Sequence, residues 1–200
     1  MIKLYLVNIN SIKEEDIKNL SAFRINKANS FTNEKDKLLS LAAGIALNEG
    51  LKEFNLLERD LEITINEFGK PYFKDRDDIK FNLSHSVDTS ICVISSKDVG
   101  CDIEKLRKYN KKIANKCFSD EEKEFILNSS NIDEAFTRIW TLKESFFKAL
   151  GNGLSFDMNG VSINPKENYI EIKQNIDLRI WKLSETKIDG NYIAICEEDY

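Results

Sequence analysis

The stretch TSICVISSKDVGCDIE, residues 89–104, predicts two neighbouring strands. Apolar and β-branched residues dominate both of its ends, and Lys97 and Asp98 form a polar connector between them. We therefore expect a β-hairpin here. The second strand carries Asp102 and Glu104, and their side chains share one face because residues two apart in a strand point to the same side.

Two carboxylates on one face of a strand need an explanation. If both were buried and unpaired, their repulsion would cost several kcal/mol or shift a pKa. A hard cation such as Mg²⁺ removes both problems, because it takes oxygen ligands. The pattern Asp-x-Glu is common by chance, so on its own it favours an exposed strand end without a function.

The patterns on either side of this stretch indicate a mixed fold. Residues 61–73, LEITINEFGKPYF, alternate like a strand, and Pro71 marks a turn or a sheet edge. Ser119 followed by Glu122 is a capping box. Strands and helices follow each other without a regular βαβ rhythm, so we expect an α+β fold. Further strands are expected at 2–9, 81–86, 161–163, 169–173, 178–183 and 191–196, and helices at 33–49, from Asp120 and at 133–150.

The composition is that of an ordinary globular chain of 200 residues, 42% hydrophobic and 32% charged. A net charge of −5 argues against nucleic acid or an anionic membrane surface as partner, because such binding usually leaves a basic footprint. The N-terminus lacks a sustained apolar region, and the most apolar run, LLSLAAGIAL, is about half as long as a membrane span. The four cysteines show no CxxC pair, so we expect reduced thiols in a cytoplasmic protein.

A third carboxylate occurs in WTLKESFFK, residues 140–148. On a helix Trp140, Glu144 and Lys148 stack on one face, because they lie four residues apart. The plain interpretation is a surface Glu–Lys pair of little energetic weight. Since apolar residues flank the pair, we expect it instead at the edge of a cleft, where Glu144 would complete a metal site with the other two carboxylates.

Two short motifs add groups that could reach an anion: the turn GKP at 69–71 and the segment NLSHS at 82–86. In chain order, FGKP, FNLSHS, VGCDIE, FSDEE and WTLKESFFKALGNGL closely resemble the 4′-phosphopantetheinyl transferases of the surfactin-synthetase-activating (Sfp) type. The motifs run from about Phe68 to Leu154, and NYIAIC near the C-terminus is similar to that family's closing strand.

The resemblance implies transfer of the phosphopantetheine arm of coenzyme A to a serine of an apo carrier protein, with Mg²⁺ as cofactor and adenosine 3′,5′-bisphosphate as the other product. It implies the 4′-phosphopantetheinyl transferase fold, with two similar α+β halves in pseudo-twofold symmetry and the active site in the crevice between them. Residues 1–100 would form the half that contacts the nucleotide, and 101–200 the half with the metal site and the carrier-docking surface. One chain would hold the whole crevice, so we expect a monomer.

By resemblance, Asp102, Glu104 and Glu144 hold Mg²⁺ against the pyrophosphate. Glu144 is also the candidate base for the serine proton, directly or through a water, although a metal-bound carboxylate is a poor base. Lys148 would touch the same phosphates. Lys143 would contact the leaving group, although it points some 100° away around the helix.

The resemblance also assigns the nucleotide end of coenzyme A. His85, which joins Glu144 and Lys148 among the expected catalytic residues, would contact the 3′-phosphate together with Ser84. Arg24 and Lys27 would bind the same phosphate, while Lys70 and Pro71 would line the adenine. Leu39 stands where the family usually has Arg, which would loosen the binding of coenzyme A.

The segment 105–118 is expected to dock an acidic carrier, and local charge would mainly speed the encounter. Ile113, Cys117 and Phe118 are its candidate apolar anchors. Two other functions stay open: a Mg²⁺-dependent nucleotide phosphohydrolase, and a non-catalytic module that binds acidic partners. Which carrier or pathway is served is left open by the sequence. The segment's basic residues are Lys105, Arg107, Lys108, Lys111, Lys112 and Lys116.

Overall fold

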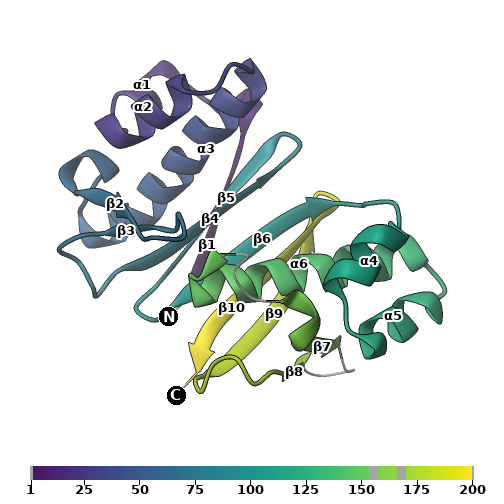
Figure 1. The fold of residues 1–200 in the computed structure, drawn as a ribbon. Coiled ribbons are helices and arrows are strands. Elements are labelled where there is room, and N and C mark those ends of the chain that lie inside the picture. The colour runs from purple at the N-terminus through teal and green to yellow at the C-terminus, as the bar shows by residue number, and fades with distance from the viewer. Residues whose placement is uncertain (1, 154–156, 166–169, 200) are drawn as a thin grey trace.

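The computed structural model describes residues 2–153, 157–165 and 170–199, which fold as two neighbouring halves (Figure 1). The first half contains β1 (Lys3–Asn8), α1 (Glu14–Ile17), α2 (Ala22–Asn29), α3 (Glu34–Leu51), β2 (Ile63–Ile65), β3 (Pro71–Phe73), β4 (Lys80–Ser86) and β5 (Thr89–Ser95), with 3-10 helices at Ile9–Ser11, Lys52–Phe54 and Glu58–Asp60. The second half contains β6 (Val99–Lys105), α4 (Lys111–Cys117), α5 (Asp120–Leu127), α6 (Ile132–Leu150), β7 (Ser162–Pro165), β8 (Ile170–Lys173), β9 (Ile180–Ile188) and β10 (Asn191–Asp199), with a 3-10 helix at Met158–Gly160.

The two halves repeat one topology. Each runs from a strand through a long helix and a small two-stranded hairpin to two final strands. In each main sheet the last strand lies in the middle, giving the orders β1-β5-β4 and β6-β10-β9 with antiparallel pairing throughout. The prediction of an α+β fold with two similar halves is therefore confirmed.

The predicted hairpin at 89–104 is wrong. β5 already has both of its edges paired, with β1 on one side and β4 on the other, so it has no free edge for β6. β6 instead pairs with β10 in the second sheet. The connection at 96–98 is thus the crossing between the two halves, and β5 forms its hairpin with the preceding strand β4 instead.

The strand β5 is buried along its whole length because both of its faces are covered. Cys92 and Ile94 pack toward the core beneath α3, whereas Ile91 and Val93 pack against β6 and β10 of the other half. The period of two in a strand assigns alternate residues to these two cores. The halves therefore share a packed apolar interface as well as a chain connection.

The long helices begin and end where the sequence predicts. Asn33 caps α3 with its side chain, and the predicted capping box at Ser119 is present at the start of α5. α6 ends at Gly151, whose φ of 74° is the left-handed conformation that glycine adopts without strain. The predicted tail strands are also found, although residue 169 lies outside the described residues.

β4 and β6 run side by side across the boundary between the halves. The Asn82 side chain accepts a hydrogen bond from the backbone N–H of Cys101 at 2.9 Å, and the Ser86 hydroxyl accepts one from Lys105 N–H at 3.2 Å. The nearly constant spacing of 19 residues in these contacts means that the strands point the same way. This seam positions the functional side chains of β4 next to those of β6.

Gly100 lets β6 approach α6 closely. A Cβ atom at this position would lie 2.1 Å from the carbonyl oxygen of Ser145 and 2.2 Å from the nitrogen of Ala149. Because both neighbours are backbone atoms, relief requires the helix to move. We expect Gly100→Ala to lower the free energy of unfolding by about 3 kcal/mol, measured in urea.

Gly160→Ala is the matched control, because a Cβ there would meet nothing within 4 Å. Its effect should stay within about 0.5 kcal/mol. Equal effects of the two substitutions would contradict the close packing of β6 on α6.

In the part of the chain that the structure describes, none of the helices combines the length and the apolar character needed to span a membrane. The four cysteines carry free thiols, and three of them, Cys92, Cys101 and Cys196, are buried. Burial raises the pKa of the Cys101 thiol to about 12, so it stays protonated at neutral pH.

Candidate active site

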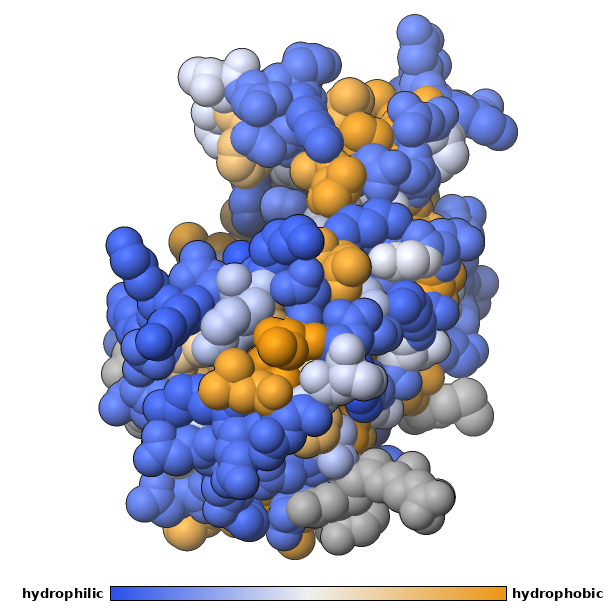
Figure 2. Space-filling model, turned by 90° about the vertical axis from the view of Figure 1, so that its right-hand side faces the viewer, coloured by the Kyte–Doolittle hydropathy of each residue, from blue (hydrophilic) through white to orange (hydrophobic). Residues whose placement is uncertain are grey.

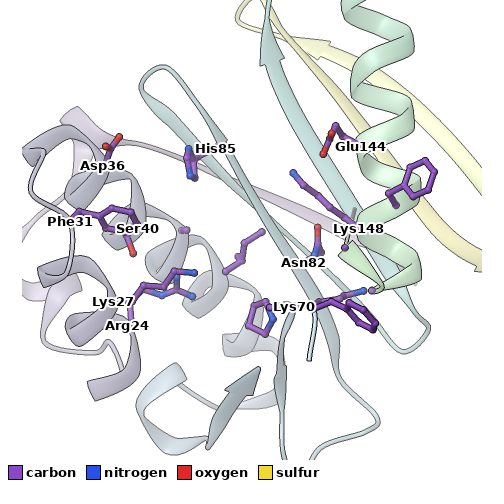
Figure 3. A pocket seen from close by; sticks show the side chains of 18 residues that line it. Arg24, Lys27, Phe31, Asp36, Ser40, Lys70, Asn82, His85, Glu144 and Lys148 are labelled. Atoms are coloured by element: carbon purple, nitrogen blue, oxygen red, sulfur yellow. The ribbon is translucent and has the colours of Figure 1, made fainter. Parts of the chain in front are cut away.

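A pocket of about 400 Å³ lies between the two halves. Figure 3 shows side chains of α2, α3 and their connection facing those of α6 across β4. Basic groups gather on the first-half side, while Glu144 and Lys148 lie on the α6 side. The lining residues with charged or polar side chains are Arg24, Lys27, Asp36, Ser40, Lys70, Asn82, His85, Glu144 and Lys148.

Asp102 is buried on the face of β6 that α6 covers, and it is joined to Lys148. Its Oδ1 accepts hydrogen bonds from Lys148 Nζ at 2.6 Å and from the Ser84 hydroxyl at 2.8 Å. Burial is the largest single effect and disfavours the Lys148 ammonium, but the charge and hydrogen bond of Asp102, together with Cys101 and Glu144, raise the pKa of Lys148 overall. Asp102 Oδ2 is buried and has no hydrogen-bond partner among the described residues.

Glu104 is held by groups of the second half. Its Oε1 accepts hydrogen bonds from Arg107 at 2.7 Å and from the Trp140 indole at 3.1 Å. The Arg107 guanidinium also lies over the Trp140 ring, 5.0 Å from its centroid. Burial and the neighbouring Asp102 raise the pKa of Glu104, against the opposite effect of Arg107.

Glu144 projects from α6 into the pocket, four residues before Lys148. Burial raises its pKa, and the charges of Asp102 and Glu104 raise it further against the pull of Lys148. Asp102 and Glu104 are therefore close enough to Glu144 to disfavour its charge, as like charges in one site do.

Among the described residues, no three His, Cys, Asp or Glu side chains are already arranged to hold a metal ion. The donor set nevertheless fits a hard cation. Asp102 Oδ2 is buried without a hydrogen-bond partner among the described residues, and burial with the neighbouring carboxylates raises the pKa values of Glu104 and Glu144, which a bound cation would offset. Carboxylate oxygens are the ligands that Mg²⁺ prefers.

The first-half side of the pocket presents an incompletely paired arginine. Arg24 is buried, and its Nε donates to Glu58 at 3.0 Å. Its Nη2 is buried without a hydrogen-bond partner among the described residues. Burial and Arg24 together lower the pKa of Lys27, because two cations lie close together. Such a pair favours an anion in the pocket.

His85 lies at the pocket surface on β4. Burial lowers the pKa of its imidazole, and the Lys148 and Lys27 charges act in the same direction against Asp36 and Asp102. The ring is therefore neutral at pH 7 when the pocket holds no anion, and it can gain a proton when an anion arrives.

Known proteins resemble this chain in sequence and in fold. The 4′-phosphopantetheinyl transferase superfamily matches residues 98–196. A 4′-phosphopantetheinyl transferase of Bacillus subtilis is 31% identical over 153 residues, which cover 74% of this chain and 68% of that protein. The chain belongs to this superfamily.

Two other known proteins are similar to this chain. The 4′-phosphopantetheinyl transferase gsp of Aneurinibacillus migulanus is 29% identical over 88% of this chain and 77% of its own length. A solved holo-(acyl-carrier-protein) synthase of Bacillus anthracis, in complex with CoA (3′,5′-ADP), matches 52% of this chain and 96% of its own with a TM-score of 0.45 and 17% identity. The predicted resemblance to phosphopantetheinyl transferases is confirmed.

One predicted ligand-binding residue of this phosphopantetheinyl transferase lies elsewhere. Lys143 is fully buried on the far side of α6, where its Nζ donates to both carboxylate oxygens of Glu122, at 2.9 and 2.7 Å, and to the carbonyl oxygen of Val161. It does not line the pocket. The assignment of Lys143 to coenzyme A is corrected for this reason: its ammonium is already neutralised inside the second half.

Lys70 and Pro71 line the pocket, and the Lys70 ammonium also has a structural task. It donates to the carbonyl oxygens of Val99 and Ala149, both at 3.0 Å, and so joins the β2–β3 turn to β6 and to the end of α6. Burial lowers the pKa of Lys70 to about 8. The side chain of Asn66 supports the same helix end by donating to Gly151 O at 2.7 Å.

Other predicted residues divide between the site and the core. Ser84 lies beneath the pocket, where it bridges Lys148 and Asp102. Leu39, at the position where the resemblance implied an Arg, is buried in the first half. The motif end at Leu154 lies outside the described residues. The sequence interpretation missed Asp36, Ser40 and Asn66, which belong to none of the quoted site motifs, and it gave no role to Asn82 within NLSHS.

The docking segment 105–118 consists of a loop and α4. Phe118 is completely buried, and Ile113 and Cys117 pack against the same core, so Phe118 cannot anchor a partner in this conformation. The exposed apolar residue of the segment is Leu106. Figure 2 views the molecule from the side on which α4 and α5 lie in Figure 1. The surface seen there is mostly hydrophilic, with hydrophobic side chains in separate groups.

Proposed function

We propose that this enzyme moves the 4′-phosphopantetheine arm of coenzyme A onto a serine of an apo carrier protein. The observation that carries the proposal is the pocket between the halves, which has an incompletely paired basic end at Arg24 and is lined on the α6 side by Glu144 and Lys148. Coenzyme A is anionic at both ends of its nucleotide, and the pocket offers cations at both ends.

The reaction joins the serine oxygen of the carrier to the phosphorus that bears the pantetheine arm. The bond from that phosphorus to the bridging oxygen of the pyrophosphate breaks, and adenosine 3′,5′-bisphosphate leaves with the electron pair. Phosphoryl transfer needs positioning and charge neutralisation more than covalent help. Lys148 would neutralise the transferred and leaving phosphates, and Glu144 would take the serine proton directly or through water.

Asp102, Glu104 and Glu144 would hold Mg²⁺, which would supply charge stabilisation to the pyrophosphate. The orphaned Asp102 Oδ2 supports this assignment. In the structure Glu104 is bound to Arg107 and Asp102 to Lys148, so these partners would have to share or release the carboxylates.

At the nucleotide end, Arg24, Lys27 and His85 would bind the 3′-phosphate. Two observations support the binding of an anion here. Arg24 Nη2 is buried without a hydrogen-bond partner among the described residues, and the Arg24 charge helps to lower the pKa of the neighbouring Lys27. Lys70 and Pro71 would line the adenine side, where their turn forms part of the pocket wall.

His85 gives this end a pH dependence. Its pKa is lowered in the anion-free pocket, and a bound phosphate would raise it, so binding would take up a proton. The benefit of His85 should therefore grow as the pH falls below 7. We expect the KM for coenzyme A of His85→Asn to exceed that of wild type about tenfold near pH 6 and to converge with it by pH 8.

The ratio of the two KM values is independent of the titration of free coenzyme A, because the same ligand is used with both enzymes. A KM ratio that does not change between pH 6 and pH 8 would contradict a phosphate contact of His85.

The acidic carrier would dock on the loop and α4 within residues 105–118, where Lys111 and Lys112 are exposed. Residues 1–100 would supply the nucleotide contacts, and 101–200 the metal and carrier contacts. The whole crevice lies within one chain, which supports a monomer. We also propose a cytoplasmic location, in keeping with the free thiols of the chain.

A panel of apo carrier proteins incubated with the enzyme, coenzyme A and Mg²⁺ tests the proposal by intact-mass spectrometry. Transfer predicts a gain of one phosphopantetheine on a carrier. A phosphohydrolase would degrade the nucleotide and leave every carrier unchanged. A binding module would leave both unchanged, and its binding would survive Glu144→Gln.

A further inference from the structure

Two tight hairpin turns occupy equivalent places in the two halves. The β4–β5 turn has Val87 and Asp88 between the paired residues Ser86 and Thr89. The β9–β10 turn has Asp189 and Gly190 between its own paired strand ends. Two-residue hairpin turns require a left-handed first residue, which is why glycine, asparagine and aspartate dominate there.

The second turn follows this rule, and the first does not. Asp189 and Gly190 have φ of 50° and 72°, as the type I′ turn requires. Val87 has a φ of 55°, whereas Asp88 is not left-handed, which is the pattern of a type II′ turn with valine in the glycine position. A β-branched residue in this conformation is strained, because its Cβ substituents collide with the backbone.

Packing within the chain does not offset the strain at Val87. Val87 is 49% exposed, so burial of its side chain stabilises the fold too little to offset the strain. Strained residues persist where the surroundings or the function need them, and the inference runs from the observed outlier to a function. An exposed apolar side chain at a strained turn is thus a candidate contact for another molecule.

The position of the turn indicates which molecule this is. Ser86, next to Val87, accepts a hydrogen bond from Lys105 N–H at 3.2 Å, which ties the turn to the first residue of the docking segment. The next residue of that segment, Leu106, is 54% exposed. His85, two residues before Val87, lines the pocket. Val87 therefore follows a strand that lines the pocket, and Leu106 lies in the basic segment that the Ser86–Lys105 hydrogen bond joins to this strand.

We propose that Val87 and Leu106 form an apolar contact for the carrier protein, seating a hydrophobic side chain beside its modified serine. The occupant follows from charge: six cations and no acid lie between residues 105 and 116, so the partner must be acidic around an apolar centre. A contact on Val87 also places the partner next to the pocket mouth. This inference rests on the proposed transfer to a carrier.

Val87→Gly separates strain from function, because it should increase the stability of the protein and weaken carrier binding. Removing the strained side chain should raise the Tm by about 3 °C. The same substitution should raise the KM for the carrier about fivefold, while kcat and the KM for coenzyme A stay unchanged. The probe is the apo carrier that the wild-type enzyme modifies fastest in the panel.

Ile180→Ala is the matched control, since it truncates an exposed apolar side chain of β9 that lies outside the docking segment and the pocket. It should leave the KM for the carrier unchanged. Leu106→Ala should raise that KM as Val87→Gly does, and the double substitution should cost less than the product of the two single effects, because both side chains contact one group.

The outcomes separate this inference from the proposed function. If the wild-type enzyme modifies no carrier, both fall. If it does and Val87→Gly retains the wild-type KM for the carrier, or raises the KM for coenzyme A equally, only the apolar contact is overturned. A Val87→Gly protein less stable than wild type would overturn the role of strain.

Discussion

Replacing Asp102 by Asn is expected to lower kcat/KM for phosphopantetheine transfer by about 100-fold or more. The substitution preserves shape but removes the charge that pairs with Lys148 and that would bind the metal. Because the pocket works by neutralising phosphate charge, the loss should appear with every carrier. Steady-state kinetics with the fastest carrier of the panel measures it.

Asp98→Asn provides the control for this result. Asp98 directly precedes the same strand, but its carboxylate pairs with Arg179 in a half-exposed contact away from the Lys148 network. Its activity should stay within about twofold of wild type, as for most exposed ion pairs. A folded Asp102→Asn enzyme with near-normal turnover would remove Asp102 from the catalytic site.

Replacing Lys143 by Met is expected to destabilise the protein by about 3–5 kcal/mol. Lys143 and Glu122 form a fully buried ion pair, so the substitution leaves Glu122 charged or protonated without its partner. Urea unfolding should show a lower midpoint. The KM for coenzyme A of the remaining folded enzyme should be unchanged, because the side chain lies outside the pocket.

Two further variants sharpen this test. Lys173→Met breaks the exposed pair with the neighbouring Glu121 and should cost less than about 1 kcal/mol. Adding Glu122→Gln to Lys143→Met should recover part of the stability, since it removes the uncompensated buried charge. A raised KM for coenzyme A with unchanged stability would restore the contact that the family resemblance implied.

Local patterns predicted the elements because caps and periodicities act over a few residues. Asn33, the capping box at Ser119 and the left-handed Gly151 fix helix ends by contacts within one turn. The hairpin at 89–104 failed because strand pairing depends on which edges remain free. β1, some eighty residues earlier in the chain, takes the edge of β5 that the hairpin needed.

The site was predictable where spacing alone places side chains together. The period of two puts Asp102 and Glu104 on the α6 side of β6, and the spacing of four puts Glu144 and Lys148 on one face of α6. The partners were not predictable, because they come from distant segments. The sequence indicates a helix-capping role for Glu122. In the structure Glu122 also neutralises Lys143, which lies twenty-one residues later.

The most direct test of the central claim measures both products in one reaction. The enzyme is incubated with coenzyme A, Mg²⁺ and an apo carrier, and the carrier mass and the released adenosine 3′,5′-bisphosphate are quantified together. We predict one bisphosphate for each phosphopantetheine gained by the carrier with wild-type enzyme, and formation of both products about 100-fold slower or more with Asp102→Asn. Bisphosphate or phosphate release without a gain in carrier mass would contradict the account.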